Sequence, residues 1–207
     1  MKTLFIPARQ KNLELELSQS QIKKLPKKLL LLYSIQYQDL ATSIKSQLKT
    51  HNIKIQKTQQ VLGCSKIKTS SPVLLISTGK FHALNLYLQT PELYILEGKT
   101  IKKIPKEEIE QLKIQRKTAL IKFLSANNIG ILVSTKPGQQ NLNLALKLKQ
   151  KIEKKYKNEK QVFIFISNNI DINQFENFNI DSWINTACSG LIVDKPTIIN
   201  YNELPKL

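Results

Sequence analysis

The chain has 207 residues, 41% of them hydrophobic, and a net charge of +17, which describes a basic globular protein of one large domain or two small ones. Its longest apolar run, Leu29–Tyr33, is far shorter than the roughly 18 residues of a membrane-spanning helix. The segment Met1–Pro7 also lacks the apolar core of a signal peptide, so we expect a cytoplasmic protein.

Short apolar runs alternate with longer amphipathic runs along the chain. The runs Leu29–Ile35 and Val73–Ser77 are apolar almost throughout, as parallel strands covered on both faces are. In chain order, the predicted strands are Thr3–Ile6, Leu29–Ile35, Ile53–Gln56, Val73–Ser77, Leu93–Leu96, Ile129–Thr135, Gln161–Ser167, Trp183–Ala187 and Thr197–Ile199.

Three amphipathic segments between these strands predict helices. Asp39–Thr50 starts with an acidic residue of the type that caps helices. Lys106–Asn127 follows a proline and has glutamates in its first turns, where negative charge suits the helix dipole. Gln139–Tyr156 has one apolar stripe, and the lysines on its opposite side indicate a solvated face.

This alternation predicts an α/β fold of two small domains, each with a mainly parallel sheet flanked by helices. The polar, lysine-rich stretch Glu97–Pro105 is the best candidate for the boundary. We therefore expect one domain at residues 1–104, which carries Cys64, and a second at 105–207, which carries Cys188.

In such sheets, ligands bind beyond the carboxyl ends of the strands, and two segments of the first domain have that position. Gly63 allows a sharp turn that brings the Cys64 thiol to a loop surface, where a thiolate can bind metal; a buried loop cysteine is the alternative. The segment Ser77–His82 follows a strong strand, and Gly79 with the next helix start is a candidate anion site. On residue type alone, a structural role is favoured for His82 over a ligand role.

The second domain has two comparable segments. Lys136 and Gln139 are expected near an anion at the start of the following helix, although the Pro-Gly turn between them is common and the signal is weak. The segment Asp181–Asp194 delivers Cys188 from a strand into a glycine-containing loop. Two distant cysteines outside a CxxC pair do not by themselves indicate a metal site, and packing at a strand end is the alternative.

The order of these segments, taken together, closely resembles the diphthamide-synthesis radical enzymes, also called 2-(3-amino-3-carboxypropyl)histidine synthases. The resemblance covers nearly the whole chain. It is carried by Gln36, by VLGC at Val61–Cys64, GKFH at Gly79–His82, STKPGQ at Ser134–Gln139, and WINTAC at Trp183–Cys188 with the later Asp194.

The resemblance implies a transferase that uses a four-iron four-sulfur cluster and S-adenosyl-L-methionine. In that family three α/β domains each donate one cysteine to the cluster, and the open iron holds the cofactor. A 3-amino-3-carboxypropyl radical then adds to a histidine of elongation factor two, in the first step of diphthamide biosynthesis. By position, Cys64 resembles the second cluster cysteine and Cys188 the third. Further cofactor contacts are expected from Gln36, Gly79, Phe81, His82, Lys136, Gly138 and Gln139.

The chain departs from the family pattern at three places. It matches only the second and third domains, so the domain that bears the first cysteine is not found in it. Ser189 and Gly190 follow Cys188 where the family usually has proline and arginine, and Ala83 stands where proline is expected. The loss of the arginine removes a fixed charge near the site.

The missing cysteine leaves three interpretations. A separate chain supplies the third ligand, so that this is half of a split enzyme; or a full-length paralogue is the catalytic subunit and this is its non-catalytic partner; or the chain is a binding module. We favour them in that order, and expect an electron donor protein and a dimer as further partners.

A different class of function is a basic RNA- or ribosome-associated protein without a cofactor. It explains the charge directly but leaves the two loop cysteines unexplained. Only Arg9 and Arg116 are arginines, whereas nucleic-acid surfaces commonly use arginine for forked contacts. A composition rich in lysine, isoleucine and asparagine is also what an AT-rich genome encodes, so we do not expect nucleic acid as a direct partner.

Overall fold

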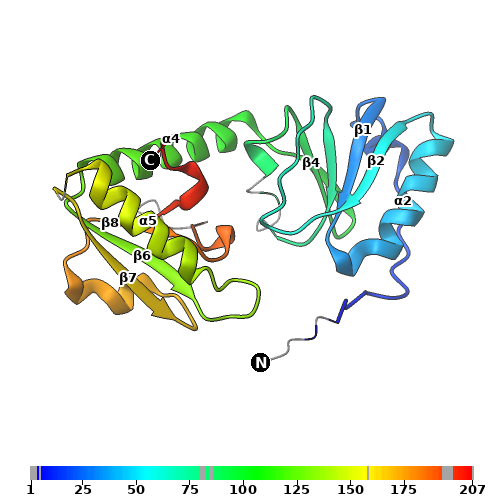
Figure 1. The fold of residues 1–207 in the computed structure, drawn as a ribbon. Helices are drawn as coiled ribbons and strands as arrows, with labels where there is room; N and C mark the ends of the chain where they lie inside the picture. The colour runs from blue at the N-terminus through cyan, green and yellow to red at the C-terminus, as the bar shows by residue number, and fades with distance from the viewer. Residues whose placement is uncertain are drawn as a thin grey trace. The chain divides into compact units, whose positions relative to one another are not determined.

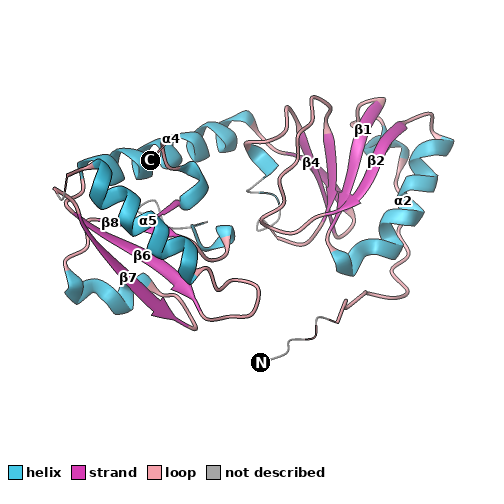
Figure 2. Cartoon of the chain, viewed as in Figure 1, coloured by secondary structure: helices cyan, strands magenta, loops and turns pink. Residues whose placement is uncertain are grey.

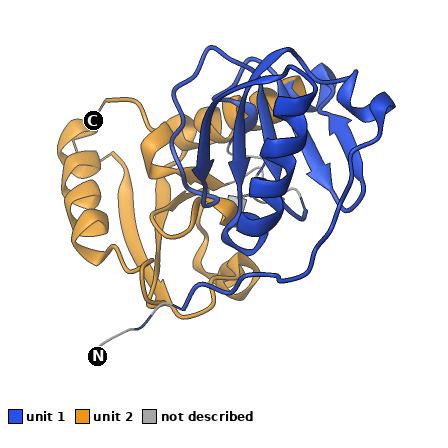
Figure 3. Cartoon of the chain, turned by 90° about the vertical axis from the view of Figure 1, so that its right-hand side faces the viewer, with its two compact units in different colours: residues 1–109 blue, residues 110–207 orange. Residues whose placement is uncertain are grey.

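The computed structural model describes residues 4, 6–79, 83, 86–157, 159–192 and 198–206. The chain forms two compact units, residues 1–109 and 110–207, and the division falls inside helix α4 (Figures 1 and 3). Each unit contains its own sheet, with helices beside it (Figure 2). The α/β fold with mainly parallel sheets is therefore confirmed.

The first unit is built on a five-stranded sheet of order β2-β1-β3-β4-β5. Its strands are β1 (Lys28–Tyr33), β2 (Lys54–Gln60), β3 (Val73–Ile76), β4 (Leu93–Glu97) and β5 (Thr100–Lys103). The first four are parallel, and β5 pairs antiparallel with β4. Helix α2 (Gln38–Thr50) buries Leu40, Ile44 and Leu48 in the same core as Leu29 and Leu31 of β1. This buried apolar face is the main reason why α2 and the sheet stay together.

The second unit has a four-stranded, all-parallel sheet of order β7-β6-β8-β9. Its strands are β6 (Asn128–Ser134), β7 (Gln161–Ser167), β8 (Ser182–Asn185) and β9 (Ile198–Asn200). Helices α4 (Lys106–Ser125) and α5 (Leu142–Lys155) contribute to one apolar cluster with the sheet, and a second cluster forms around Trp183 and Phe165. Three 3-10 helices, η2 (Ile172–Phe178), η3 (Ser189–Ile192) and η4 (Tyr201–Glu203), complete the unit.

One predicted strand is wrong. Leu4 and Ile6 are not in a strand and are 83% and 78% exposed, because in this structure their apolar side chains have no core to enter. The stretch Glu97–Pro105, expected at the domain boundary, contains strand β5, and the division between the two units lies between residues 109 and 110. A strand at the edge of a sheet buries only one side chain here, Ile101, so its sequence has the polarity of a loop.

Hydrophobic periodicity also could not predict elements of only a few residues. Helix α1 (Gln19–Ile22) has a single turn, held by a capping box between Ser18 and Gln21. The predicted strand Thr197–Ile199 corresponds to β9, and Thr197 itself lies outside the described residues.

Among the residues that the structure describes, no helix has the length and apolar character needed to cross a membrane.

A buried lysine closes the end of α4. Lys160 is 6% exposed, and its ammonium donates to the carbonyl oxygens of Phe123 (3.3 Å), Leu124 (2.8 Å) and Ala126. It also lies 4.9 Å from the centre of the Tyr156 ring. These carbonyls lie at and just beyond the C-terminus of α4, where positive charge is favourable. Burial lowers the pKa of Lys160, and the nearby carboxylates of Glu159 and Asp181 oppose this.

We expect Lys160→Met to lower the free energy of unfolding of the second unit by about 2 kcal/mol, because the helix-end carbonyls lose a charged donor. The exposed Lys151→Met on α5 is the matched control, with an expected change within about 0.5 kcal/mol. Urea denaturation followed by circular dichroism measures both. Equal stabilities of the two variants would contradict the capping role.

Candidate cofactor and metal site

The carboxyl edge of the first sheet collects the loops that follow β1, β2 and β3, because these strands run parallel. Gln36 follows β1, and its side-chain amide donates to the Thr78 hydroxyl in the loop after β3 at 3.1 Å. The next residue, Gly79, has a φ of +69° and donates its N–H to Glu97 Oε1 at 2.9 Å. The structure thus joins Gln36 to the Gly79 loop, and a carboxylate of the chain already engages the Gly79 N–H.

Cys64 follows β2 in an exposed turn at the same edge. The Leu62 N–H donates to Ser65 Oγ at 2.8 Å, and the Ser65 N–H donates to the Leu62 oxygen at 3.0 Å. These two bonds hold the turn around the cysteine. Phe81 and His82, expected to contact a cofactor, lie outside the described residues.

The carboxyl edge of the second sheet contains a cavity of about 140 Å³. Lys136 and Gln139 from the loop after β6 line it together with Cys188 from the loop after β8. Asn168, which follows β7, lines it as well. Three residues singled out in the sequence, from loops some fifty residues apart, therefore share one small space.

The loop that holds Lys136 and Gln139 is a tight turn. The Gln139 N–H donates to the Lys136 oxygen at 3.0 Å, and Gly138 has a φ of +76°. Proline followed by glycine with positive φ is the pattern of a type II turn. Helix α5 begins three residues after Gln139, at Leu142, rather than at Gln139 itself. Lys136 and Gln139 therefore belong to a turn that precedes the helix.

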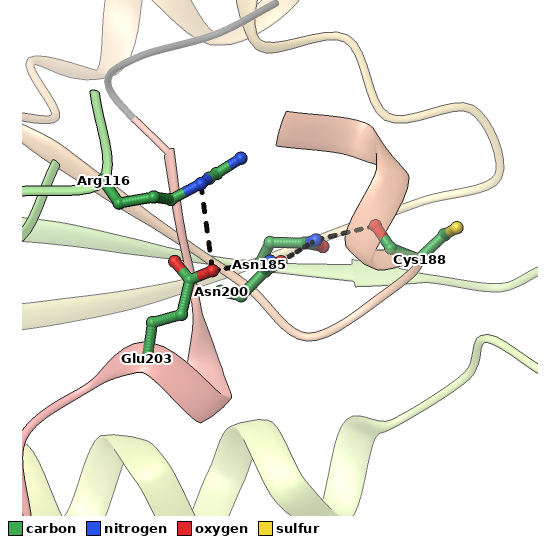
Figure 4. Close-up of polar contacts among 5 residues, drawn as sticks. All are labelled: Arg116, Asn185, Cys188, Asn200 and Glu203. Atoms are coloured by element: carbon green, nitrogen blue, oxygen red, sulfur yellow. Dashed lines mark hydrogen bonds and ion pairs between the residues drawn. The ribbon is translucent and has the colours of Figure 1, made fainter. Parts of the chain in front are cut away.

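The Cys188 loop is fixed by asparagines that the sequence analysis did not single out. Asn141 donates from Nδ2 to the Thr186 oxygen at 2.7 Å. Asn185, at the end of β8, donates from Nδ2 to the Cys188 oxygen at 2.8 Å and to Asn200 Oδ1 at 2.8 Å (Figure 4). For Asn185 the sequence offered two signals, its place in the WINTAC motif and an asparagine inside a buried strand, where an amide requires partners.

An ion pair lies behind this loop. Arg116 Nε and Glu203 Oε1 are 3.9 Å apart, and Asn200 Nδ2 donates to the same oxygen at 3.4 Å (Figure 4). Burial lowers the pKa of Arg116, whereas the Glu203 carboxylate raises it. The segment Ser189–Ile192, which begins where the family has proline and arginine, forms η3.

Comparison with known proteins bears directly on this site. The family model of diphthamide synthesis proteins matches residues 1–201. The chain belongs to the diphthamide synthesis protein family. Among curated proteins, it is similar to the 2-(3-amino-3-carboxypropyl)histidine synthase of Pyrococcus horikoshii, with 24% identity over 208 aligned positions that cover 93% of this chain and 60% of that protein.

Solved structures of Dph2 from Pyrococcus horikoshii share the fold. One has a TM-score of 0.74 at 20% identity, and the other, a crystal structure with a 4Fe-4S cluster, has a TM-score of 0.73 at 22% identity. In both cases the match covers 89% of this chain and 58% of the Dph2 chain. This diphthamide synthesis protein therefore spans about three fifths of the length of the relatives it matches.

The donor set fits such a cluster only in part. Both cysteines are free thiols that follow parallel strands, and thiolates are the usual ligands of iron–sulfur clusters. Within the described part of the chain, however, no three His, Cys, Asp or Glu side chains lie together as a metal-binding group. Each unit thus contributes one free thiol of the kind that such a cluster uses.

The two thiols differ in exposure, since Cys64 is exposed and Cys188 is part-buried. We expect iodoacetamide to alkylate the iron-free chain in two phases at neutral pH, with Cys64 reacting faster because its sulfur is more accessible. Cys64→Ser should remove the fast phase and Cys188→Ser the slow one, as measured by mass spectrometry of tryptic peptides. Faster alkylation of Cys188 would contradict this order.

Proposed function

We propose that this chain is a subunit, or one half, of a 2-(3-amino-3-carboxypropyl)histidine synthase. It would help to transfer the 3-amino-3-carboxypropyl group of S-adenosyl-L-methionine to a histidine of elongation factor two. The observation that carries the proposal is the cavity that Cys188 shares with Lys136 and Gln139. Family membership and the named relative support the same reaction.

In this proposal, Cys64 and Cys188 are ligands of a four-iron four-sulfur cluster. A bound cluster supplies the electron for reductive cleavage of a carbon–sulfur bond in S-adenosyl-L-methionine. The residues of the chain hold and orient the cofactor. The Lys136 ammonium is a donor suited to a carboxylate, and the Gln139 amide offers both a donor and an acceptor next to the Cys188 loop.

The remaining proposed cofactor contacts come from both units of the chain. The backbone of Gly138 shapes the turn that presents Lys136 and Gln139. Gln36 and Gly79 belong to the first unit, where Thr78 connects their loops. Phe81 and His82 are proposed from the resemblance alone.

A third thiolate is proposed to come from a separate chain. A four-iron cluster with only two protein ligands leaves two irons open, which exposes it to hydrolysis and oxidation. In the family that the sequence resembles, the first cluster cysteine belongs to a further α/β domain, so we expect the partner to be a protein of about one domain. An alternative is that a full-length paralogue is the catalytic subunit and this chain is its non-catalytic partner. A dimer and an electron donor protein belong to either proposal.

We expect anaerobic reconstitution with iron and sulfide to give a stable four-iron cluster only when such a partner chain is present. Cys64→Ala and Cys188→Ala should each abolish the visible charge-transfer absorption of the cluster, because each removes a ligand. Each should also abolish the modification of elongation factor two. The measurements are iron content, electron paramagnetic resonance and mass spectrometry of the elongation factor. Lys151→Ala on the exposed face of α5 is the control and should retain both.

Three outcomes would contradict this proposal. A complete, stable cluster on the isolated chain would reject the split enzyme. Full activity of either cysteine variant in the assembled enzyme would show that its thiolate is not required. RNA binding that weakens steeply with salt, together with no cluster in any assembly, would favour the basic RNA- or ribosome-associated protein instead.

The Lys136–Gln139 turn gives a separate prediction. We expect the double variant Lys136→Ala, Gln139→Ala to bind S-adenosyl-L-methionine about tenfold or more weakly, since it loses a charged and a neutral hydrogen bond. Equilibrium dialysis on the assembled enzyme measures the dissociation constant. The control is Lys147→Ala, Gln150→Ala on α5, which alters the same residue types away from the cavity. Unchanged affinity in the first variant would reject the assignment of this turn.

A further inference from the structure

The side chain of Asn185 forms hydrogen bonds to the backbone of the Cys188 loop. Asn185 is 1% exposed at the carboxyl end of β8. Its Oδ1 accepts the Ala187 N–H at 2.9 Å, and its Nδ2 donates to the Cys188 oxygen at 2.8 Å. One amide therefore binds the peptide group before Ala187 and the peptide group after Cys188, so it bridges the Ala187–Cys188 dipeptide and restricts the backbone that carries the thiol.

The orientation of this amide is forced by chemistry. The Ala187 N–H can only donate and the Cys188 carbonyl can only accept, so only one of the two amide orientations of Asn185 satisfies both. The same Nδ2 donates to Asn200 Oδ1 at 2.8 Å across the paired strands β8 and β9. Asn200 must then direct its own Nδ2 away from Asn185.

The Glu203 carboxylate lies where that second amide group points. Asn200 Nδ2 donates to Glu203 Oε1 at 3.4 Å, and Arg116 Nε lies 3.9 Å from the same oxygen. An ionised carboxylate only accepts hydrogen bonds, so it favours the same direction of the Asn200 amide that Asn185 requires. Figure 4 shows these residues as one connected chain that ends at Cys188.

We propose that Asn185 is a positioning residue for Cys188, and that the Arg116–Glu203 ion pair supports it by keeping the Asn200 Oδ1 turned toward Asn185. This inference rests on the proposed role of Cys188 as an iron ligand. A metal site requires its ligands within about half an ångström of their bound positions, and a fixed backbone supplies that accuracy before the metal arrives. The ion pair therefore acts on the Cys188 backbone through the side-chain amides of Asn200 and Asn185.

The test uses the full chain with Cys64→Ser, so that Cys188 is the single thiol. Asn185→Asp keeps an acceptor for Ala187 but removes both donated bonds. Glu203→Gln replaces an acceptor-only group with one that also donates, so Asn200 loses its fixed direction. Asn143→Asp on the exposed side of α5 is the matched control, because the substitution is the same and Asn143 does not line the cavity.

We expect Asn185→Asp to raise the rate of Cys188 alkylation by iodoacetamide about three- to tenfold, because the loop loses hydrogen bonds that hold it closed. Glu203→Gln should give a smaller increase, and Asn143→Asp a rate close to that of the parent chain. Circular dichroism and the unfolding temperature establish that each variant is folded. In the cluster-bearing assembly with Cys64 restored, Asn185→Asp should also shift the g-values of the reduced cluster, which a purely structural role would leave unchanged.

The two readouts separate this inference from the proposed function. If the parent assembly holds a cluster but Asn185→Asp has parental alkylation and parental g-values, the positioning role is rejected and the proposed function stands. If no assembly holds iron, the proposed function fails, and Asn185 then has no metal ligand to position. The alkylation rates still show whether Asn185 holds the Cys188 loop. A parental rate in Glu203→Gln would reject the contribution of the ion pair.

Discussion

The parallel direction of the strands is the constraint on which the site depends. Parallel strands place all their carboxyl ends at one edge of a sheet, so loops distant in sequence meet there without any special linker. In the second unit this brings the loops after β6, β7 and β8 around one small cavity. The same rule in the first unit places the Gln36, Cys64 and Gly79 loops at one edge.

Local structure in these loops follows from a few residue types that meet specific backbone requirements. Proline and glycine at 137 and 138 form the turn beside the cavity, and the buried amides of Asn141 and Asn185 bind backbone groups of the Cys188 loop. Close packing behind the sheet supports this arrangement. At Gly130 of β6, an added Cβ would lie only 2.4 Å from the Trp183 ring, so the indole of β8 packs directly against the backbone of its neighbour.

Most strands and the three long helices could be predicted from the sequence, because the spacing of their apolar residues follows which side chains are buried. Gln161–Ser167 was predicted with the bounds of β7, and the cysteine loops were found because they follow such strands. Strand β5 was missed because it buries only Ile101, and Leu4 and Ile6 were misassigned because an apolar pattern alone does not provide a partner strand. The cap formed by Lys160 could not be predicted, because its partners lie 34 to 37 residues away in sequence. Asn185 was part of a quoted motif, but its bond to Asn200 across the strands could not be read from the sequence.

The lysines of the first sheet suggest a use for part of the positive charge that involves no partner molecule. Its two outer strands, β2 and β5, expose Lys54, Lys57, Lys102 and Lys103. An outer strand has unpaired backbone groups that can recruit a strand from another molecule, and charged side chains there repel such an approach. The sheet is thereby protected on both flanks against growing into intermolecular aggregates.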